Sequence, residues 1–217
     1  MNKLFYLINF LYEFTTDSFV HLKKRNLHPG NILYNRYQPQ IVDLGLPVLE
    51  SETDDIKDIK GVMPFMAPEL LSGGSYSQAT DVYAFGMIMW EISSNEKPFH
   101  EFNHDEQLAL RICKGLRPEV TNDTPPFYRE LMQKCWHSDP TKRPTAKEIY
   151  ELSTNLYLKE TAEIQDQIEK AEKVRQENME IKKEPKPSHP GAIYTSRLMP
   201  NISKMLSEGK FYKPSHE

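Results

Sequence analysis

The chain contains, between residues 24 and 33, the stretch Lys24-Arg25-Asn26-Leu27-His28-Pro29-Gly30-Asn31-Ile32-Leu33. Two short runs of strand-forming residues follow its polar part, at 31–34 and 40–43, and a turn from Asn35 to Pro39 separates them. We therefore expect a small two-stranded hairpin directly after a polar loop.

Downstream, the chain is dominated by helical patterns. Residues 81–92 are almost continuously apolar, which predicts a helix buried on all sides. Three further segments, 106–114, 127–136 and 146–157, have the spacing of amphipathic helices, with polar or proline-containing joints between them. The fold class that these patterns predict is mainly α, with one small hairpin.

Three motifs occur in a fixed order along this part of the chain. Residues 24–33 stand where a protein kinase has H-R-D-L-x-x-x-N-I-L, residues 43–45 (Asp-Leu-Gly) stand for D-F-G, and residues 67–69 (Ala-Pro-Glu) form the A-P-E string. Together they resemble the C-terminal lobe of a protein kinase. Residues 61–66 and the Cys135-Trp136 pair also resemble this family, especially its tyrosine-kinase-like branch and fungal-type kinase-like proteins.

The resemblance assigns chemical roles to four residues. Asp43 matches the aspartate that binds magnesium, and Asn31 matches the asparagine that holds the second metal ion beside ATP. Asn26, next to Arg25, occupies the position of the aspartate that accepts the substrate hydroxyl proton. An amide has no comparable basicity near neutral pH. A purely structural role stays open for the first two, with Asn31 closing a turn and Asp43 capping the next segment.

Two features limit the catalytic interpretation further. Residues 21–26 can also be aligned with the end of the preceding helix, with the H-R-D tripeptide deleted, and that alignment also leaves no aspartate in the loop. The 217 residues contain neither G-x-G-x-x-G nor V-A-I-K, the strings that contact ATP phosphates in kinases. We expect the N-terminal lobe to be missing and no cofactor to bind this chain, although the resemblance implies ATP and magnesium.

Three other residues match structural positions of the family. Glu69 of A-P-E should pair with Arg143 of Asp139-Pro140-Thr141-Lys142-Arg143-Pro144, in a buried carboxylate–guanidinium contact. Asp81 matches the aspartate that anchors the catalytic-loop backbone, and we expect it to hydrogen-bond backbone near residues 24–27. A plain role as a helix N-cap is compatible with Asp81 as well.

Composition restricts the kind of partner. Hydrophobic residues make up 38% of the chain and charged residues 27%, and the formal net charge is −4, which argues against a general nucleic-acid or membrane binder. With only two cysteines, a disulfide framework is improbable and a cytoplasmic, reducing location fits best. The expected partner is an unidentified protein, for which another kinase is one candidate.

The N-terminal end of the chain is an apolar run. The apolar run Met1–Tyr12 lacks a signal-peptide cleavage site and is too short and polar to span a bilayer, so it predicts a helix. We expect this helix, or a partner, to cover apolar groups near Leu27, Ile32, Leu33, Leu44 and Leu46.

Residues 1–157 should form the kinase-like domain. Residues 158–183 predict a charged helix, either solvated or, less simply, a short coiled coil, and residues 184–217 predict a proline-containing linker and a mobile tail.

Two further motifs occur in the chain. Residues 100–104 match H-E-x-x-H, but the motif binds zinc only inside a helix and a loop precedes it here, so we expect no zinc. Ser51 and Thr53 lie in an acidic run that could be phosphorylated, or simply form a solvated loop. The function predicted from these residues is a catalytically inactive, truncated pseudokinase that acts by protein binding. The alternative is a functional protein kinase whose N-terminal lobe lies outside this chain.

Overall fold

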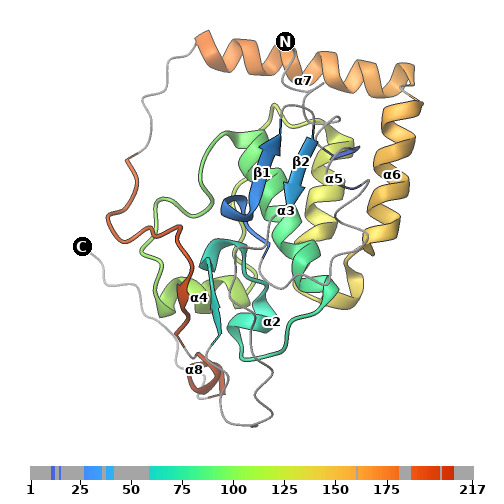
Figure 1. The fold of residues 1–217 in the computed structure, drawn as a ribbon. Helices are drawn as coiled ribbons and strands as arrows, with labels where there is room; N and C mark the ends of the chain where they lie inside the picture. Colours follow the sequence, from blue (N-terminus) through green and yellow to red (C-terminus); the bar gives the residue numbers. More distant parts are fainter. Residues whose placement is uncertain are drawn as a thin grey trace.

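The order of elements follows the sequence patterns closely. The computed structural model describes residues 11–12, 15, 27–35, 38–41, 59–159, 161–180, 187–200 and 202–207. Its helices are α2 (Pro68–Leu71), α3 (Gln78–Ser94), α4 (Glu106–Cys113), α5 (Pro126–Cys135), α6 (Ala146–Leu158), α7 (Ala162–Glu180) and α8 (Ser203–Ser207). Its strands are β1 (Ile32–Asn35), β2 (Gln38–Ile41), β3 (Lys60–Gly61) and β4 (Arg197–Leu198), and 3-10 turns span Pro29–Asn31, Met63–Phe65 and Pro140–Lys142. The described part is mainly helical, as predicted (Figure 1).

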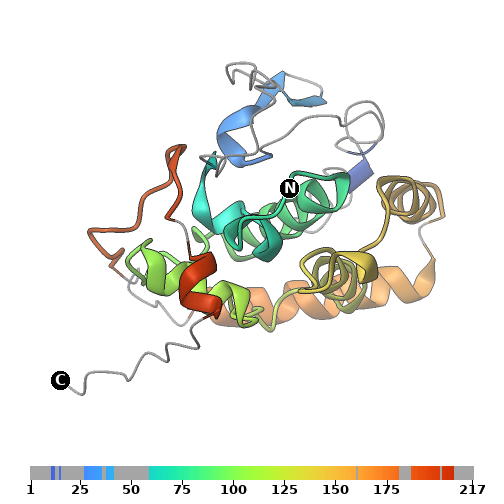
Figure 2. The ribbon, with the colours of Figure 1, turned by 90° about the horizontal axis from the view of Figure 1, so that it is seen from below.

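Helix α3 is the centre of the core. Its residues from Thr80 to Trp90 are all buried, which the apolar run predicted. It packs against α5 at Gly86, where a Cβ would lie 2.9 Å from the Cβ of Cys135. Glycine is needed here because a side chain would push the two helices apart. Figure 2 shows the β1–β2 hairpin on one side of α3 and α7 on the other.

The hairpin is present, with a shorter connection than predicted. Strands β1 and β2 are antiparallel, with Ile32 opposite Ile41 and Tyr34 opposite Pro39. Pro39 therefore belongs to a strand and not to the turn. A proline is tolerated here because each strand of a two-stranded sheet is an edge strand, where the missing N–H group need not cost a ladder bond.

Local signals explain where the amphipathic helices begin. The carboxylate of Asp105 accepts hydrogen bonds from Gln107 N at 2.9 Å and Leu108 N at 3.1 Å, so Asp105 is the N-cap of α4. Thr145 and Glu148 form a capping box at the start of α6.

The charged extension is a helix that packs on the lobe. Ile168 and Ala171 of α7 are buried, and the Gln167 side chain accepts a hydrogen bond from Phe127 N at the start of α5, at 3.1 Å. The thin apolar stripe that the sequence showed is thus enough to dock α7, whose other faces remain charged. A freely solvated helix is not what the structure shows.

The described N-terminal residues lie against α6. The Tyr12 ring stacks on Tyr157 with centroids 4.1 Å apart, and the Thr15 hydroxyl lies 2.6 Å from the Ser153 hydroxyl. Residues 1–10, Leu44 and Leu46 lie outside the described residues, so the predicted cover over the catalytic-loop side stays a prediction. Of the face it was meant to cover, Leu27 is buried and Leu33 is exposed.

The C-terminal residues differ from the expectation of a mobile tail. Residues 187–200 and 202–207 contact the lobe, and β4 pairs antiparallel with β3. Helix α8 lies beside the end of α2, where the Ser203 hydroxyl donates to Ser72 O at 3.0 Å (Figure 1). The proline-rich composition of the linker gave no sign of these contacts, which depend on partners about a hundred residues away.

Candidate functional site

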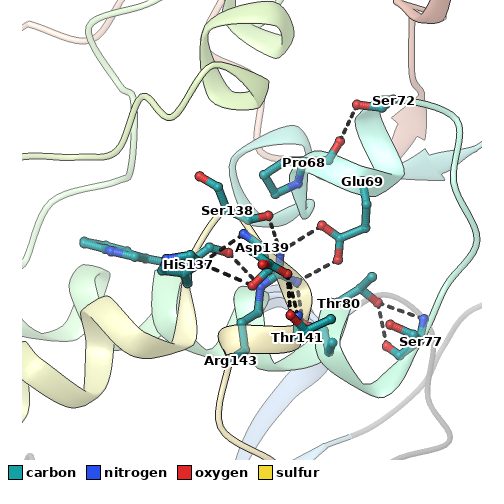
Figure 3. Close-up of polar contacts among 12 residues, drawn as sticks. Pro68, Glu69, Ser72, Ser77, Thr80, His137, Ser138, Asp139, Thr141 and Arg143 are labelled. Atoms are coloured by element: carbon teal, nitrogen blue, oxygen red, sulfur yellow. Dashed lines mark hydrogen bonds and ion pairs between the residues drawn. The ribbon is translucent and has the colours of Figure 1, made fainter.

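A buried arginine joins the A-P-E segment to the lobe. Arg143 Nη1 donates to Glu69 Oε1 at 2.7 Å, and Nη2 donates to Glu69 Oε2 at 2.8 Å (Figure 3). The same guanidinium donates to Ala79 O and to His137 O, both at 2.8 Å. The Arg143 side chain is 0% exposed and that of Glu69 is 25% exposed. This bidentate ion pair, which we call the arginine anchor, is the contact that the sequence predicted.

Short turns aim the two partners at each other. Glu69 lies in the first turn of α2, which begins at Pro68, a favoured helix start because proline lacks the N–H group that would be unsatisfied there. Arg143 follows the turn Pro140–Lys142, where the Asp139 carboxylate accepts from Thr141 N at 2.9 Å and from the Thr141 hydroxyl at 2.7 Å (Figure 3).

An aromatic ring lies between two arginines beside the anchor. The Cζ atoms of Arg117 and Arg143 lie 4.9 Å and 5.2 Å from the centroid of the Tyr83 ring. Burial raises the pKa of Tyr83 to about 12, so its hydroxyl stays protonated near neutral pH. No described residue forms a hydrogen bond with this hydroxyl. The ring, and not the hydroxyl, is therefore what the two cations contact.

Asp81 connects α3 to the loop before the hairpin. The backbone of Leu27 donates a hydrogen bond to its carboxyl group, as predicted, and burial raises the Asp81 pKa to about 7. We call this contact the loop anchor. Asp81 is not the N-cap of α3: Ser77 occupies that position, and the Thr80 hydroxyl donates to Ser77 O at 2.7 Å. Asp81 lies one turn further in, from where its side chain reaches the loop.

A small pocket lies between the loop anchor and the A-P-E segment. Its lining combines the Asp81 carboxyl group with apolar side chains, and consists of Leu27, Val62, Phe65, Met66, Leu70, Tyr76, Thr80, Asp81 and Ala84. The apolar lining explains why the carboxyl group is poorly hydrated and why its pKa is raised.

The described part of the polar loop is a tight turn. The His28 ring nitrogen Nδ1 accepts a hydrogen bond from Gly30 N at 3.1 Å, and Asn31 N donates to His28 O at 2.9 Å. Burial lowers the His28 pKa, which favours the neutral ring that can accept this bond. Asn31 thus ends a 3-10 turn directly before β1, in agreement with the structural alternative for this residue.

The remaining predicted site residues cannot be placed with these. Arg25, Asn26 and Asp43 lie outside the described residues, as do Ser51 and Thr53 of the acidic run. The structure therefore brings Glu69 to Arg143 and Asp81 to the loop. The roles of Asn26 and Asp43 stay predictions from sequence.

No metal centre is visible in the described ranges. Among those residues, no three His, Cys, Asp or Glu side chains lie together in a way that could hold a metal ion. The H-E-x-x-H string is a turn before α4 and not a helix: His100 Nδ1 contacts Lys97 O at 3.0 Å, and His104 Nε2 contacts Phe99 O at 3.1 Å. Of the magnesium ligands implied by the resemblance only Asn31 is described, and one amide oxygen does not make a magnesium site.

No described helix is both long and apolar enough to cross a bilayer.

Sequence reasoning missed the residues that fasten the C-terminal segment. Tyr194, Arg197 and Met199 contact the lobe through the loop at 97–104 and through Ile59. The one signal that could have found them is the cluster of apolar and aromatic residues from 192 to 202, which is unusual for a solvated tail.

Comparisons with known proteins agree with the motifs. The family of protein tyrosine and serine/threonine kinases matches residues 11–152. A probable serine/threonine-protein kinase of Dictyostelium discoideum is 38% identical over 140 residues, covering 62% of this chain and 15% of that protein. The dual specificity protein kinase shkC of the same organism is 35% identical over 147 residues, 65% of this chain and 28% of its own length. The serine/threonine-protein kinase STY17 of Arabidopsis thaliana is 28% identical over 150 residues, 69% of this chain and 25% of its own length. The chain thus spans less than a third of each relative.

Proposed function

The chain belongs to the protein tyrosine and serine/threonine kinase family, and we propose that within it the chain is a pseudokinase that acts by binding a protein. On this proposal the lobe keeps the family's fold and presents surfaces to a partner, without transferring phosphate. The two thiols, Cys113 and Cys135, are free, which supports a reducing, intracellular setting.

The observation that carries the proposal is Asn26 at the position of the catalytic base. General-base catalysis needs a group that can take a proton near neutral pH, and a carboxamide cannot. The 217 residues also lack the glycine-rich loop and the strand lysine that contact the nucleotide phosphates in kinases. By contrast, the arginine anchor and the loop anchor, which support folding, are both formed.

The alternative is an active protein kinase, and two observations favour it. The relatives are named as kinases, two of the three as serine/threonine kinases and one as dual specificity. The chain also retains Asn31 and Asp43, the residues that match the family's magnesium ligands. When bound, magnesium ATP would supply the phosphoryl group, and these two oxygen-bearing side chains would hold the metal.

A phosphate-transfer assay on the purified chain separates the two functions. The chain is incubated with magnesium and radiolabelled ATP, with a generic protein substrate, beside Asp43→Ala and Asn26→Asp variants. We expect no incorporation above the Asp43→Ala background, and no gain from Asn26→Asp, because a restored base does not replace missing phosphate contacts. Incorporation that depends on magnesium and disappears in Asp43→Ala would establish the active kinase and reject the pseudokinase.

A further inference from the structure

The C-terminal residues follow one edge of the lobe in an extended course. The tail segment, defined as residues 187–200 and 202–207, passes the loop at 97–104, then β3, and ends beside α2 (Figures 1 and 2). Its backbone bonds to three separate places: His189 N donates to His100 O at 2.8 Å, and Met199 N donates to Ile59 O at 2.8 Å. In the other direction His104 N donates to Gly191 O at 3.0 Å.

The middle of the tail segment is added to the lobe as a strand. In the β3–β4 ladder Lys60 lies opposite Leu198 and Gly61 opposite Arg197. Side chains alternate along the segment as they do in a strand: Leu198 is 52% exposed, whereas Met199 is 8% exposed. Main-chain pairing of this kind recognises an extended chain, and the alternate side chains supply the specificity.

A histidine provides the first side-chain recognition point. His104 is buried, and burial lowers its pKa, which favours the neutral ring. His104 Nε2 lies 3.1 Å from Phe99 O, and Nδ1 lies 2.9 Å from Ile193 O and 3.1 Å from Ile193 N, so both ring nitrogens are within hydrogen-bond distance of backbone groups. The Tyr194 ring meets the His104 ring edge-on, with centroids 4.9 Å apart.

Two polar groups of the tail segment complete this point. The Tyr194 hydroxyl donates to Pro98 O at 3.0 Å, and the Arg197 guanidinium donates to His104 O. Tyr194 and Arg197 thus both satisfy carbonyl groups of the 97–104 loop. A residue without an aromatic hydroxyl or a guanidinium group would leave these acceptors to water.

Close backbone approach and burial define the two ends of the contact. A Cβ at Gly191 would lie 2.0 Å from Asn103 Oδ1, and a Cβ at Gly73 would lie 2.9 Å from Ser203 Oγ. Ile202 is fully buried at 0% exposure and belongs to the hydrophobic core, directly before Ser203, whose hydroxyl donates to Ser72 O. The tail segment therefore contacts the lobe from Gly191 to Ser203, and not only at the two-residue β3–β4 ladder.

We infer that the surface formed by Ile59–Gly61, Ser72–Gly73 and Lys97–His104 is a peptide-docking groove, and that the tail segment is its intramolecular ligand. The ligand class is an extended peptide with a tyrosine, an arginine three residues later and a methionine two residues after that. A partner protein with such a segment would compete with the chain's own tail for the groove. The inference deepens the proposed binding function, but it does not depend on whether phosphate is transferred.

The small size of this contact should allow another peptide to replace the chain's own tail segment in the groove. A two-residue ladder, a few hydrogen bonds to the 97–104 loop and the buried side chains of Met199 and Ile202 form a small contact, which is weak on its own. Covalent attachment to the lobe raises its occupancy, because it turns binding into an intramolecular step with an effective concentration on the order of mM. Weakening the chain's own tail should therefore expose the groove to a peptide added in solution.

The test uses the full chain and a fluorescent peptide of residues 187–207. Fluorescence anisotropy measures its binding to the unaltered chain, to a Tyr194→Ala/Arg197→Ala chain and to a Thr195→Ala/Ser196→Ala control, whose altered side chains are exposed. We expect binding to the first variant to be at least about tenfold tighter than to the unaltered chain or the control, because its own tail no longer competes. A peptide carrying Tyr194→Ala and Arg197→Ala should lose this affinity.

Equal affinity for all three chains, or no binding to any, would overturn the inference. A second measurement guards against a variant that folds poorly: amide hydrogen exchange in the unaltered chain. We expect His189, Ile193 and Met199 to exchange slowly, since their N–H groups are bonded to the lobe or its side chains. Fast exchange at these three amides would show that the groove is not occupied, and would equally reject the inference.

Discussion

The arginine anchor and the loop anchor are both buried polar contacts of the same lobe, yet they differ in how completely their charge is compensated. Arg143 is matched by both oxygens of Glu69 and by backbone carbonyls on two sides. Among the described residues, no cation is paired with Asp81. Burial raises its pKa, and the hydrogen bond from the Leu27 backbone only partly opposes this effect. In its apolar setting, the Asp81 carboxyl group therefore titrates near neutrality.

The largest expected effect comes from breaking the arginine anchor. Arg143→Ala leaves Glu69 without its partner and removes the hydrogen-bond donor of two backbone carbonyl groups. We therefore expect a loss of about 3 kcal/mol in the free energy of unfolding. The estimate is at the low end for buried pairs because Glu69 is 25% exposed and can be partly rehydrated. Urea denaturation followed by circular dichroism measures it.

A neighbouring cation serves as the matched control for that experiment. Lys142 is exposed, and Lys142→Ala should change the free energy of unfolding by less than about 0.5 kcal/mol. If both variants unfolded at the same urea concentration, the ion pair would contribute nothing beyond an ordinary surface charge, and the contrast between the two anchors would disappear.

The loop anchor should make the free energy of unfolding depend on pH. Its pKa of about 7 in the folded chain lies above the ordinary value of 3.8. Between about pH 4 and pH 7 the folded chain therefore keeps a proton that the unfolded chain has released, so this group's contribution to stability falls as pH rises. Asp81→Asn keeps a neutral side chain with an acceptor oxygen for Leu27 and removes the titration. Its stability relative to the unaltered chain should rise by a few kcal/mol across this pH window.

Denaturation curves from pH 4 to pH 8 measure that difference. Asp139→Asn is the control of opposite sign, because hydrogen bonds from Thr141 lower the pKa of the Asp139 carboxyl group. Its stabilising contribution is present above the ordinary pKa and is lost on acidification, so the variant should differ from the unaltered chain least at low pH. Parallel pH curves for Asp81→Asn and the unaltered chain would mean that Asp81 is ionised and hydrated in the folded state.

The smallest expected change in stability comes from Tyr83, beside the arginine anchor. Two substitutions there separate the contribution of its ring from that of its hydroxyl group. Tyr83→Phe removes a buried hydroxyl that makes no hydrogen bond to any residue in the described part of the chain, and it keeps the ring that Arg117 and Arg143 contact. We expect a gain of roughly 1 kcal/mol or less in the free energy of unfolding, because an unsatisfied polar group is replaced by hydrogen. Tyr83→Leu should instead lose stability with the cation–π contacts. Loss in both variants would indicate that the hydroxyl is bonded through water.

Local sequence was enough to predict α3, α4, α5 and α6, but not the short helix α2. The unbroken apolar run of α3 has only one stable environment, the interior, and the Asp105 and Thr145 caps indicate where α4 and α6 begin. The arginine anchor was predicted in a different way, through the family motifs that Glu69 and Arg143 match. Spacing alone could not have paired two residues 74 positions apart.

The role of Asp81 shows where local rules stop. From the sequence, Asp81 could be either the N-cap of a helix or a contact to the catalytic loop, because both roles need only a carboxylate near the start of a helix. Packing decided between them, because Ser77 takes the cap and the first turn of α3 points Asp81 at Leu27. The raised pKa then follows from the apolar pocket lining, which no sequence window contains.

What the sequence determined by itself is the resemblance to the kinase family and the order of the helices, since these depend on residue identity and short-range spacing. The assignment of Asn26 to the position of the catalytic base stays a prediction from sequence. Only the tertiary structure decided the course of the C-terminal segment and the docking of α7. Their contacts, such as His189 with His100 and Gln167 with Phe127, join residues 40 or more positions apart through single hydrogen bonds and a few apolar side chains. Contacts of that kind leave no periodic pattern in the chain, because each depends on a surface that exists only after the lobe has folded.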